Sequence, residues 1–141
     1  MVLVCVTDQE SCGRLIETGR KLADISSSLL KVICVRPRRS EYWFASDEVE
    51  YLFNKAKQLD AEMIIRFHDY ALEAVIDYIQ THEIHSVIVG TPPQAGQSIF
   101  ISGLEEQFPD LPIISVDTDG SLQLVPVFQD LTFPSLYDYG R

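Results

Sequence analysis

The run Val87-Ile88-Val89 constrains the fold most strongly, because it is apolar at consecutive positions and stops abruptly at Gly90. Consecutive β-branched residues are typical of a strand that is covered on both faces, as in the middle of a parallel sheet. Beyond Gly90 the sequence changes to two prolines, a glycine and small polar residues, and apolar helical spacing resumes at Ile99. A loop that leaves the carboxyl end of a central parallel strand is where open α/β sheets bind ligands.

Similar apolar runs occur along the chain at residues 2–6, 30–35, 63–65 and 113–116. Segments with helical apolar spacing separate all of them, and strands that alternate with helices favour a parallel sheet with right-handed crossovers. We therefore predict an α/β fold, a doubly wound, Rossmann-like open sheet of five parallel strands in the order 3-2-1-4-5.

The helices are predicted from apolar stripes at helical spacing. The first helix is expected to begin at a capping box formed by Thr-Asp-Gln-Glu at residues 7–10, and the third to be capped by His68 or Asp69. The four stripes are Leu15, Ile16, Gly19, Leu22 and Ala23; Val49, Leu52, Phe53, Ala56 and Leu59; Ala71, Ala74, Val75, Tyr78 and Ile79; and Ile99, Phe100, Leu104 and Phe108.

The C-terminal part departs from this alternation. Residues 122–127 are predicted to form an edge strand, where Pro126 is tolerated. Residues 128–141 contain several aromatic side chains, and a segment this aromatic is expected to pack either on its own domain or on a second subunit. We predict one α/β domain over residues 1–116, and an edge strand with an aromatic tail over residues 117–141 that supports a homodimer or packs on the same chain.

The charge of the chain excludes some classes of partner. The formal net charge is −10, so long-range repulsion opposes binding to nucleic acid and to anionic membranes. No apolar run approaches the roughly 18 residues that a membrane span needs, and the N-terminus lacks the basic region of a secretory signal. We expect a cytoplasmic protein with no nucleic acid partner and no membrane insertion.

No catalytic template is complete. The histidines of His-Glu-Ile-His at residues 82–85 are three apart, whereas two zinc ligands on one helix face need four-residue spacing. Neither a G-x-x-x-x-G-K-[ST] loop nor a G-x-S-x-G elbow occurs. Cys5 and Cys34 lie in predicted strands and are expected in the core, whereas Cys12 opens a predicted helix. We therefore expect a non-catalytic protein that requires no metal and no cofactor.

Two loops are predicted to meet where the strand order reverses. The loop after the first strand carries Thr7 and Asp8, and the loop after the fourth strand carries Gly90 and Thr91. Asp8 is suited to accept hydrogen bonds from a ribose or a base, and the backbone N–H groups around Gly90 are suited to face a phosphate. The alternative is that Asp8 only caps a helix and Gly90 only allows a tight exit from the strand.

Basic residues follow the second strand. Arg36, Arg38 and Arg39 lie at its carboxyl end, beside the predicted crevice, where guanidinium groups can bind an anion through paired hydrogen bonds. The alternative is a solvated loop that balances an acidic surface.

Residues 2–116 resemble the universal stress proteins, through the Thr7-Asp8 pair and through Gly90 at the end of the fourth strand. In nucleotide-binding members this glycine begins a motif, G-x2-G-x9-G-(S/T), that wraps the phosphates. Its four positions fall on Gly90, Pro93, Gly103 and Leu104. Pro93 lacks an N–H group and Leu104 lacks a hydroxyl, which argues against the family's triphosphate cradle in this chain.

The sequence resembles more closely the stress-protein-like domain of potassium-sensing (KdpD-type) histidine kinases, through Val-Ile-Val-Gly-Thr-Pro-Pro and the Thr-Asp-x-x-Ser opening. That resemblance implies a cytoplasmic regulatory module for signal transduction or stress response, with ATP, AMP or a cyclic dinucleotide as a possible ligand and a signalling protein as a partner. The alternative is a decayed pocket in a homodimerising interaction module. The candidate ligand-binding residues are Thr7, Asp8, Val35, Arg36, Arg38, Gly90, Thr91 and Gly103.

Overall fold

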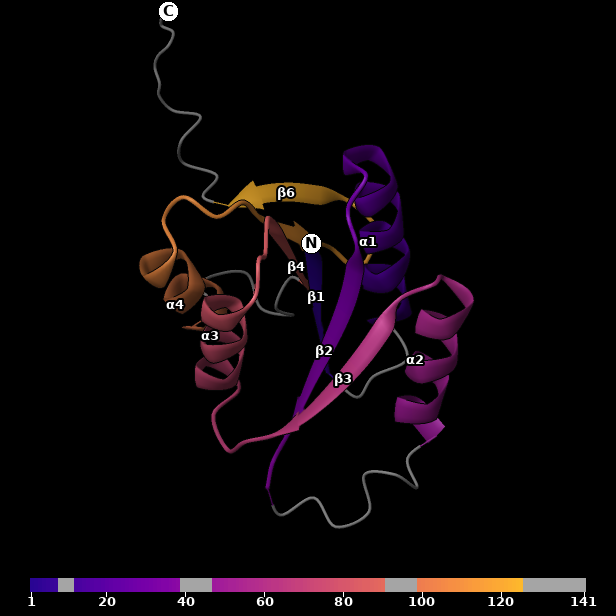
Figure 1. Ribbon diagram of the computed structural model, residues 1–141, viewed down its shortest axis with the longest axis horizontal. Helices are drawn as coiled ribbons and strands as arrows, with labels where there is room; N and C mark the ends of the chain where they lie inside the picture. The colour runs from indigo at the N-terminus through magenta and orange to yellow at the C-terminus, as the bar shows by residue number, and fades with distance from the viewer. Residues whose placement is uncertain (8–11, 39–46, 91–98, 126–141) are drawn as a thin grey trace, which may run out of the picture.

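One mixed sheet organises the computed structural model, which describes residues 1–7, 12–38, 47–90 and 99–125. The strands are β1 (Val2–Val6), β2 (Leu30–Arg36), β3 (Glu62–Phe67), β4 (Ser86–Gly90), β5 (Ile113–Val116) and β6 (Leu122–Val125), in the order β3-β2-β1-β4-β5-β6 (Figure 1). The first five strands are parallel, and β6 pairs antiparallel with β5. The predicted fold class, the strand order 3-2-1-4-5 and the C-terminal edge strand are confirmed.

Helices cover both faces of the sheet. They are α1 (Gly13–Ser26), α2 (Asp47–Gln58), α3 (Ala71–Thr81) and α4 (Ile99–Gln107). In Figure 1, α1 and α2 lie on one side of the sheet and α3 and α4 on the other. This arrangement explains why consecutive residues of the central strands are apolar, since alternate side chains point into two separate cores.

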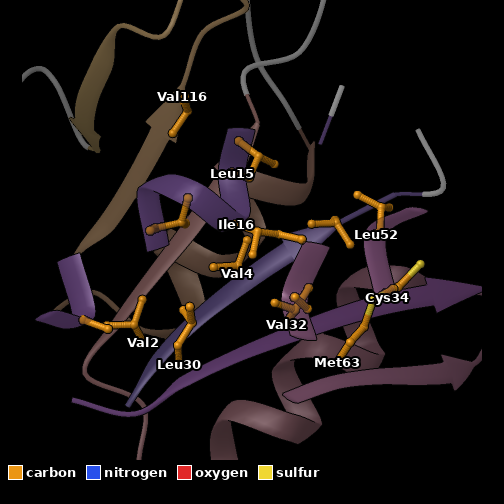
Figure 2. Close-up of a cluster of buried hydrophobic side chains, with 14 of the residues drawn as sticks. Val2, Val4, Leu15, Ile16, Leu30, Val32, Cys34, Leu52, Met63 and Val116 are labelled. Atoms are coloured by element: carbon orange, nitrogen blue, oxygen red, sulfur yellow. The ribbon is translucent and has the colours of Figure 1, made fainter. Parts of the chain in front are cut away.

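The two cores divide the central strands residue by residue. Val4 and Ile88 belong to the core under α1 and α2, part of which Figure 2 shows, and both are completely buried. Leu3 and Val87 belong to the core under α3 and α4 and are equally buried. The run at residues 87–89 is therefore a strand enclosed on both faces, as the sequence predicts.

Close packing of α1 on the sheet depends on Gly19. A Cβ atom built on Gly19 would lie 2.5 Å from Cγ2 of Val4 and 2.9 Å from Cδ1 of Leu30. The helix ends after Ser26, and Ser27 takes a left-handed conformation with φ of 54°. The helix therefore ends within the serine run at residues 26–28, where a residue other than glycine occupies the left-handed position.

Two predicted helix caps are wrong. α1 begins at Gly13 with Cys12 at the N-cap and no side-chain cap, well beyond the capping box predicted at residues 7–10, of which residues 8–10 lie outside the described residues. α3 begins after Tyr70 rather than after His68 or Asp69. Thr7 directly follows β1, and His68 and Asp69 directly follow β3, with Tyr70 between them and α3.

Some residues of the predicted apolar stripes are exposed. Phe53 is 41% exposed and Ile99 is 84% exposed, and Ala71 is also exposed. On α2, Lys55 forms an ion pair with Glu17 and therefore faces α1. Phe53 points away from α1, toward the side of the sheet where β3 is the last described strand. Helical spacing alone does not show which flank of a helix has a neighbour.

The boundary predicted after residue 116 is followed by a turn and by β6, and β6 pairs with β5 in the same sheet. Residues 126–141 lie outside the described residues, so the packing predicted for the aromatic tail stays a prediction.

We predict that Gly19→Ala destabilises the fold. Adding a methyl group to a packed core costs about 1–3 kcal/mol, and we expect the upper end because two buried carbon atoms would lie within 3.0 Å of the new Cβ. The higher helix propensity of alanine offsets about 1 kcal/mol of this cost. Urea denaturation should show a free energy of unfolding about 2 kcal/mol lower. Lys21→Ala on the exposed side of α1 is the control, and equal stability of the Gly19 variant and the wild type would contradict the packing argument.

Candidate functional site

The boundary between β1 and β4 is where the strand order reverses, and pairing there is short. Register pairing across this boundary ends at Val4↔Ile88, although β1 continues to Val6 and β4 to Gly90. Over these last residues β1 stays paired with β2, and β4 stays paired with β5. The two strands therefore separate at their carboxyl ends, which is the place where sheets of this topology bind ligands.

The structure places Thr7 and Gly90 at this separation, at the ends of β1 and β4. Asp8 and Thr91 lie outside the described residues. Thr7 is exposed, and its hydroxyl oxygen lies 3.4 Å from Sγ of Cys12 at the start of α1. The Thr7 hydroxyl therefore lies beside the start of α1, directly after β1, and its part in a ligand site stays a prediction.

Gly90 is exposed and is not forced by packing to be a glycine. A Cβ atom built on Gly90 would meet only Cδ1 of Leu15, at an ordinary contact distance of 3.6 Å. Its backbone is not left-handed, unlike that of Gly120, which has φ of 90°. A tight, left-handed exit from the strand therefore does not explain the glycine.

Hydrogen bonds tie together the loops after β2 and β3. The N–H of His68 donates to the carbonyl of Arg36 at 2.9 Å, and the N–H of Arg38 donates to a carboxylate oxygen of Asp69 at 3.2 Å. Nδ1 of His68 accepts the N–H of Tyr70 at 2.9 Å. The end of β2 and the residues after it, 36–38, which we call the arginine loop, are therefore anchored through their backbone. Arg36 is half-buried and Arg38 is exposed. The sequence assigned His68 and Asp69 to a helix cap and missed this role.

Two candidate residues pack against other parts of the protein. Val35 is half-buried and packs against the core under α3 and α4. Gly103 lies in the middle of α4, where a Cβ atom would overlap Cδ2 of Leu72 on α3. Contact between two helices therefore accounts for the glycine that the resemblance assigns to phosphate binding.

Arg14 is a basic residue that the sequence analysis missed. It lies in the first turn of α1, which contains no acidic residue, the reverse of the usual preference at a helix N-terminus. The pKa of Asp119 is lowered, chiefly because the N–H of Ser121 donates to its carboxylate at 2.9 Å and to a lesser extent by the charge of Arg14. An arginine at this helical position is a signal that sequence reasoning could have used.

The described residues do not supply a metal centre or a membrane span. No group of three or more His, Cys, Asp or Glu residues among them is arranged to hold a metal ion. Within the same ranges, every helix is too short or too polar to cross a bilayer.

Comparisons with known proteins point to one fold. No family model matches the sequence, and no curated protein matches it. The structure is similar to that of a universal stress protein from Archaeoglobus fulgidus, with a TM-score of 0.63 and 10% identity over 81% of this chain and 90% of that chain. The likeness is one of fold, and it agrees with the resemblance noted in the sequence. It carries no information on the KdpD-type domains.

We predict that the three cysteines differ in reactivity. Cys5 is half-buried, but desolvation raises the pKa of its thiol to about 12, so little thiolate forms at mildly alkaline pH, and Cys34 is completely buried; neither should react with a thiol reagent. Cys12 is half-buried and should react in the native protein. Titration with a chromogenic disulfide should count one fast thiol, and none after Cys12→Ser. Rapid reaction of all three in the folded state would contradict the buried positions.

Proposed function

We propose that this chain is a non-catalytic regulatory module of the universal stress protein type, which senses an adenine-type nucleotide or a nucleotide second messenger. The observation that carries the proposal is the separation of β1 and β4 at their carboxyl ends, after Val4 and Ile88. Ligands of α/β sheets occupy this position because the crossovers that follow the two strands leave toward opposite faces. The fold shared with a universal stress protein is consistent with it.

Basic groups at the same edge favour an anionic ligand. Arg36 is the last residue of β2 and Arg38 follows it, and Arg14 lies in the first turn of α1, which follows β1. In a chain with net charge −10, these arginines are the side chains at this edge that are suited to bind a phosphate. The hydrogen bonds from the Arg36 and Arg38 backbone to the loop after β3 hold this segment in place before any ligand arrives.

The packing of α4 favours a ligand with few phosphates. Leu104, which stands where the family motif has a hydroxyl, is completely buried in the core under α3 and α4. Gly103 packs on Leu72. The motif positions on this helix therefore serve packing, which favours AMP or a cyclic dinucleotide over a wrapped triphosphate.

The proposed mechanism is a population shift. Ligand binding favours one arrangement of the loops after β1 and β4, and a signalling protein recognises that arrangement. No cofactor is required and no reaction is catalysed. The resemblance to KdpD-type domains supports a cyclic dinucleotide as the ligand and the cytoplasm as the location.

Isothermal titration calorimetry against ATP, AMP and cyclic dinucleotides tests the proposal directly. We expect saturable heat with at least one of these nucleotides, with AMP or a cyclic dinucleotide binding more tightly than ATP. Heats equal to those of a buffer titration for all of these nucleotides would rule out the proposal of nucleotide sensing.

We predict that Arg38→Ala weakens nucleotide binding about tenfold, because a charge-assisted hydrogen bond contributes about 1.5–3 kcal/mol. The variant keeps the backbone N–H that binds Asp69, so the loop should stay anchored. Lys57→Ala, which removes an exposed cation from the last turn of α2, is the matched control and should bind like the wild type. Equal affinity of the two variants would place the ligand away from the arginine loop.

A second candidate function is an interaction module that homodimerises without binding nucleotide. Two exposed leucines on β6 favour it, Leu122 at 57% and Leu124 at 60% exposure. Purified protein with excess absorbance at 260 nm favours the first candidate, whereas nucleotide-free protein that forms a stable dimer favours the second.

A further inference from the structure

The histidine that follows β3 holds the start of α3 through one ring nitrogen. Nδ1 of His68 lies 2.9 Å from the backbone nitrogen of Tyr70, the residue that immediately precedes α3. A backbone N–H group can only donate, so Nδ1 is the acceptor and carries no proton. His68 is therefore neutral in this contact, with its single ring proton on Nε2.

Protonation of the ring removes this contact. Both nitrogens of a charged imidazole are donors, so Nδ1–H of a protonated His68 would face the N–H of Tyr70 with no acceptor between them. Histidine changes its charge between about pH 5 and 8. The hydrogen bond between His68 and Tyr70 is therefore one that a moderate fall in pH can break.

The protonated ring has a second partner on α3. Nε2 of His68 lies 3.9 Å from a carboxylate oxygen of Glu73, and this contact is an ion pair only when the ring is charged. Neutral His68 is thus bonded to Tyr70, whereas charged His68 is attracted to Glu73. Two alternative partners for two protonation states are what a proton-driven switch requires.

The charged groups around His68 act in both directions. Arg36 and Arg38, which the loop after β3 contacts through hydrogen bonds, disfavour a positive charge on the ring. Asp69, the next residue in the chain, and Glu73 of α3 favour it. Charge therefore neither prevents protonation of His68 nor makes it permanent.

The remaining neighbours leave the ring open to solvent. The His68 side chain is 28% exposed, so protons can reach it. Tyr70 meets the ring edge-on, with the two ring centres 6.1 Å apart. The guanidinium of Arg66 on β3 lies over the ring of Tyr78, 5.6 Å from its centre.

The residues that would move also anchor the arginine loop. The N–H of His68 donates to the carbonyl of Arg36 at 2.9 Å, and the carboxylate of Asp69 accepts the N–H of Arg38 at 3.2 Å. Asp69 lies between His68 and Tyr70 in the chain, so the bond from Tyr70 to His68 closes a turn around it. Loss of that bond frees the backbone that positions the Asp69 carboxylate.

We infer that protonation of His68 releases residues 68–70 from the start of α3 and loosens the arginine loop. Neutral His68 holds the turn closed, and charged His68 exchanges Tyr70 for Glu73. Acidification then weakens the binding of a phosphate-bearing ligand at Arg38, a consequence that rests on the proposed function. The added positive charge is paired with Glu73 and does not replace the lost anchoring.

Amide hydrogen exchange measured by NMR tests the switch in the full chain without a ligand. Protection factors compare each measured rate with the intrinsic rate, which removes the ordinary effect of pH on exchange. Histidine changes charge between about pH 7.5 and 5.5, whereas carboxylates ordinarily stay ionised. Over this range the protection of the Tyr70 amide should fall about threefold to tenfold, as expected for the loss of one hydrogen bond. The Arg38 amide should lose protection over the same range.

Two substitutions of His68 separate the proton from the hydrogen bond. An asparagine side-chain oxygen accepts the N–H two residues further on but takes up no proton in this range. His68→Asn should therefore protect the Tyr70 amide equally at both pH values. His68→Ala, which has no acceptor, should leave this amide weakly protected at both.

His82→Asn is the matched control. Nδ1 of His82 lies 2.9 Å from the carbonyl of Tyr78, which can only accept, so this nitrogen donates in either protonation state. The His82 variant should keep the full response of the Tyr70 amide to pH. Circular dichroism checks that each variant is folded.

Calorimetric titration with AMP at both pH values tests the consequence for a ligand. The affinity of the wild type is compared with that of His68→Asn, because titration of the AMP phosphate affects both proteins alike and cancels. Acidification should weaken binding to the wild type about threefold more than binding to the variant, since one anchoring hydrogen bond is lost.

The outcomes are distinguishable. Protection of the Tyr70 amide that is constant with pH, or that falls equally in His68→Asn, overturns the switch even when AMP binds. Falling protection with an unchanged ratio of the two affinities overturns the link to the ligand. Absence of heat with every nucleotide overturns nucleotide sensing, whereas the exchange data still decide whether His68 controls the loop.

Discussion

Burial of the central strands on both faces is the constraint on which the rest of the structure depends. Leu3 and Val4 are adjacent in β1 and both completely buried, yet they belong to different cores. A strand enclosed in this way has no side chain that can reach a ligand, so polar contacts must come from residues beyond its end. Because parallel strands end at the same edge, Thr7, which follows β1, lies at the same edge of the sheet as Arg36 and Gly90, which end β2 and β4.

The separation of β1 from β4 follows from the same arrangement. The chain crosses to one face after β1, to form α1, and to the other face after β4, to form α4 (Figure 1). The surroundings of three glycines show how closely the helices pack. Gly19 lets α1 pack closely against Val4, and Gly103 lets α4 pack closely against α3. Gly90 has neither close neighbours nor a left-handed backbone. Of these three, only Gly90 is at the separated strand ends, where the lack of a side chain would allow a ligand to approach the backbone closely.

The two proposed activities use different parts of the sheet and are compatible. The arginines and the separated strands lie at the carboxyl edge, whereas β6 lies beyond β5 at the side of the sheet. The net charge of −10 opposes association between copies of the chain, whereas the arginines offer positive charge to an anionic ligand.

Periodicity in the sequence was enough to predict the strands, the helices and the parallel sheet, because two-sided burial requires unbroken apolar runs and alternation with helices requires parallel crossovers. The strand order came from the fold type that this alternation suggested. Much of the candidate site was not predictable in this way. The start of α1 at Cys12, the tie between Arg36 and His68 and the exposure of Phe53 depend on neighbours distant in the sequence. Likewise, the motif that suggested phosphate binding at Gly103 could not show that Leu72 fills the space beside it. The sequence by itself determined which segments are buried, since this depends on the pattern of apolar side chains within each segment. Only the tertiary structure decided which glycines serve packing, because this depends on which side chains another segment places beside them.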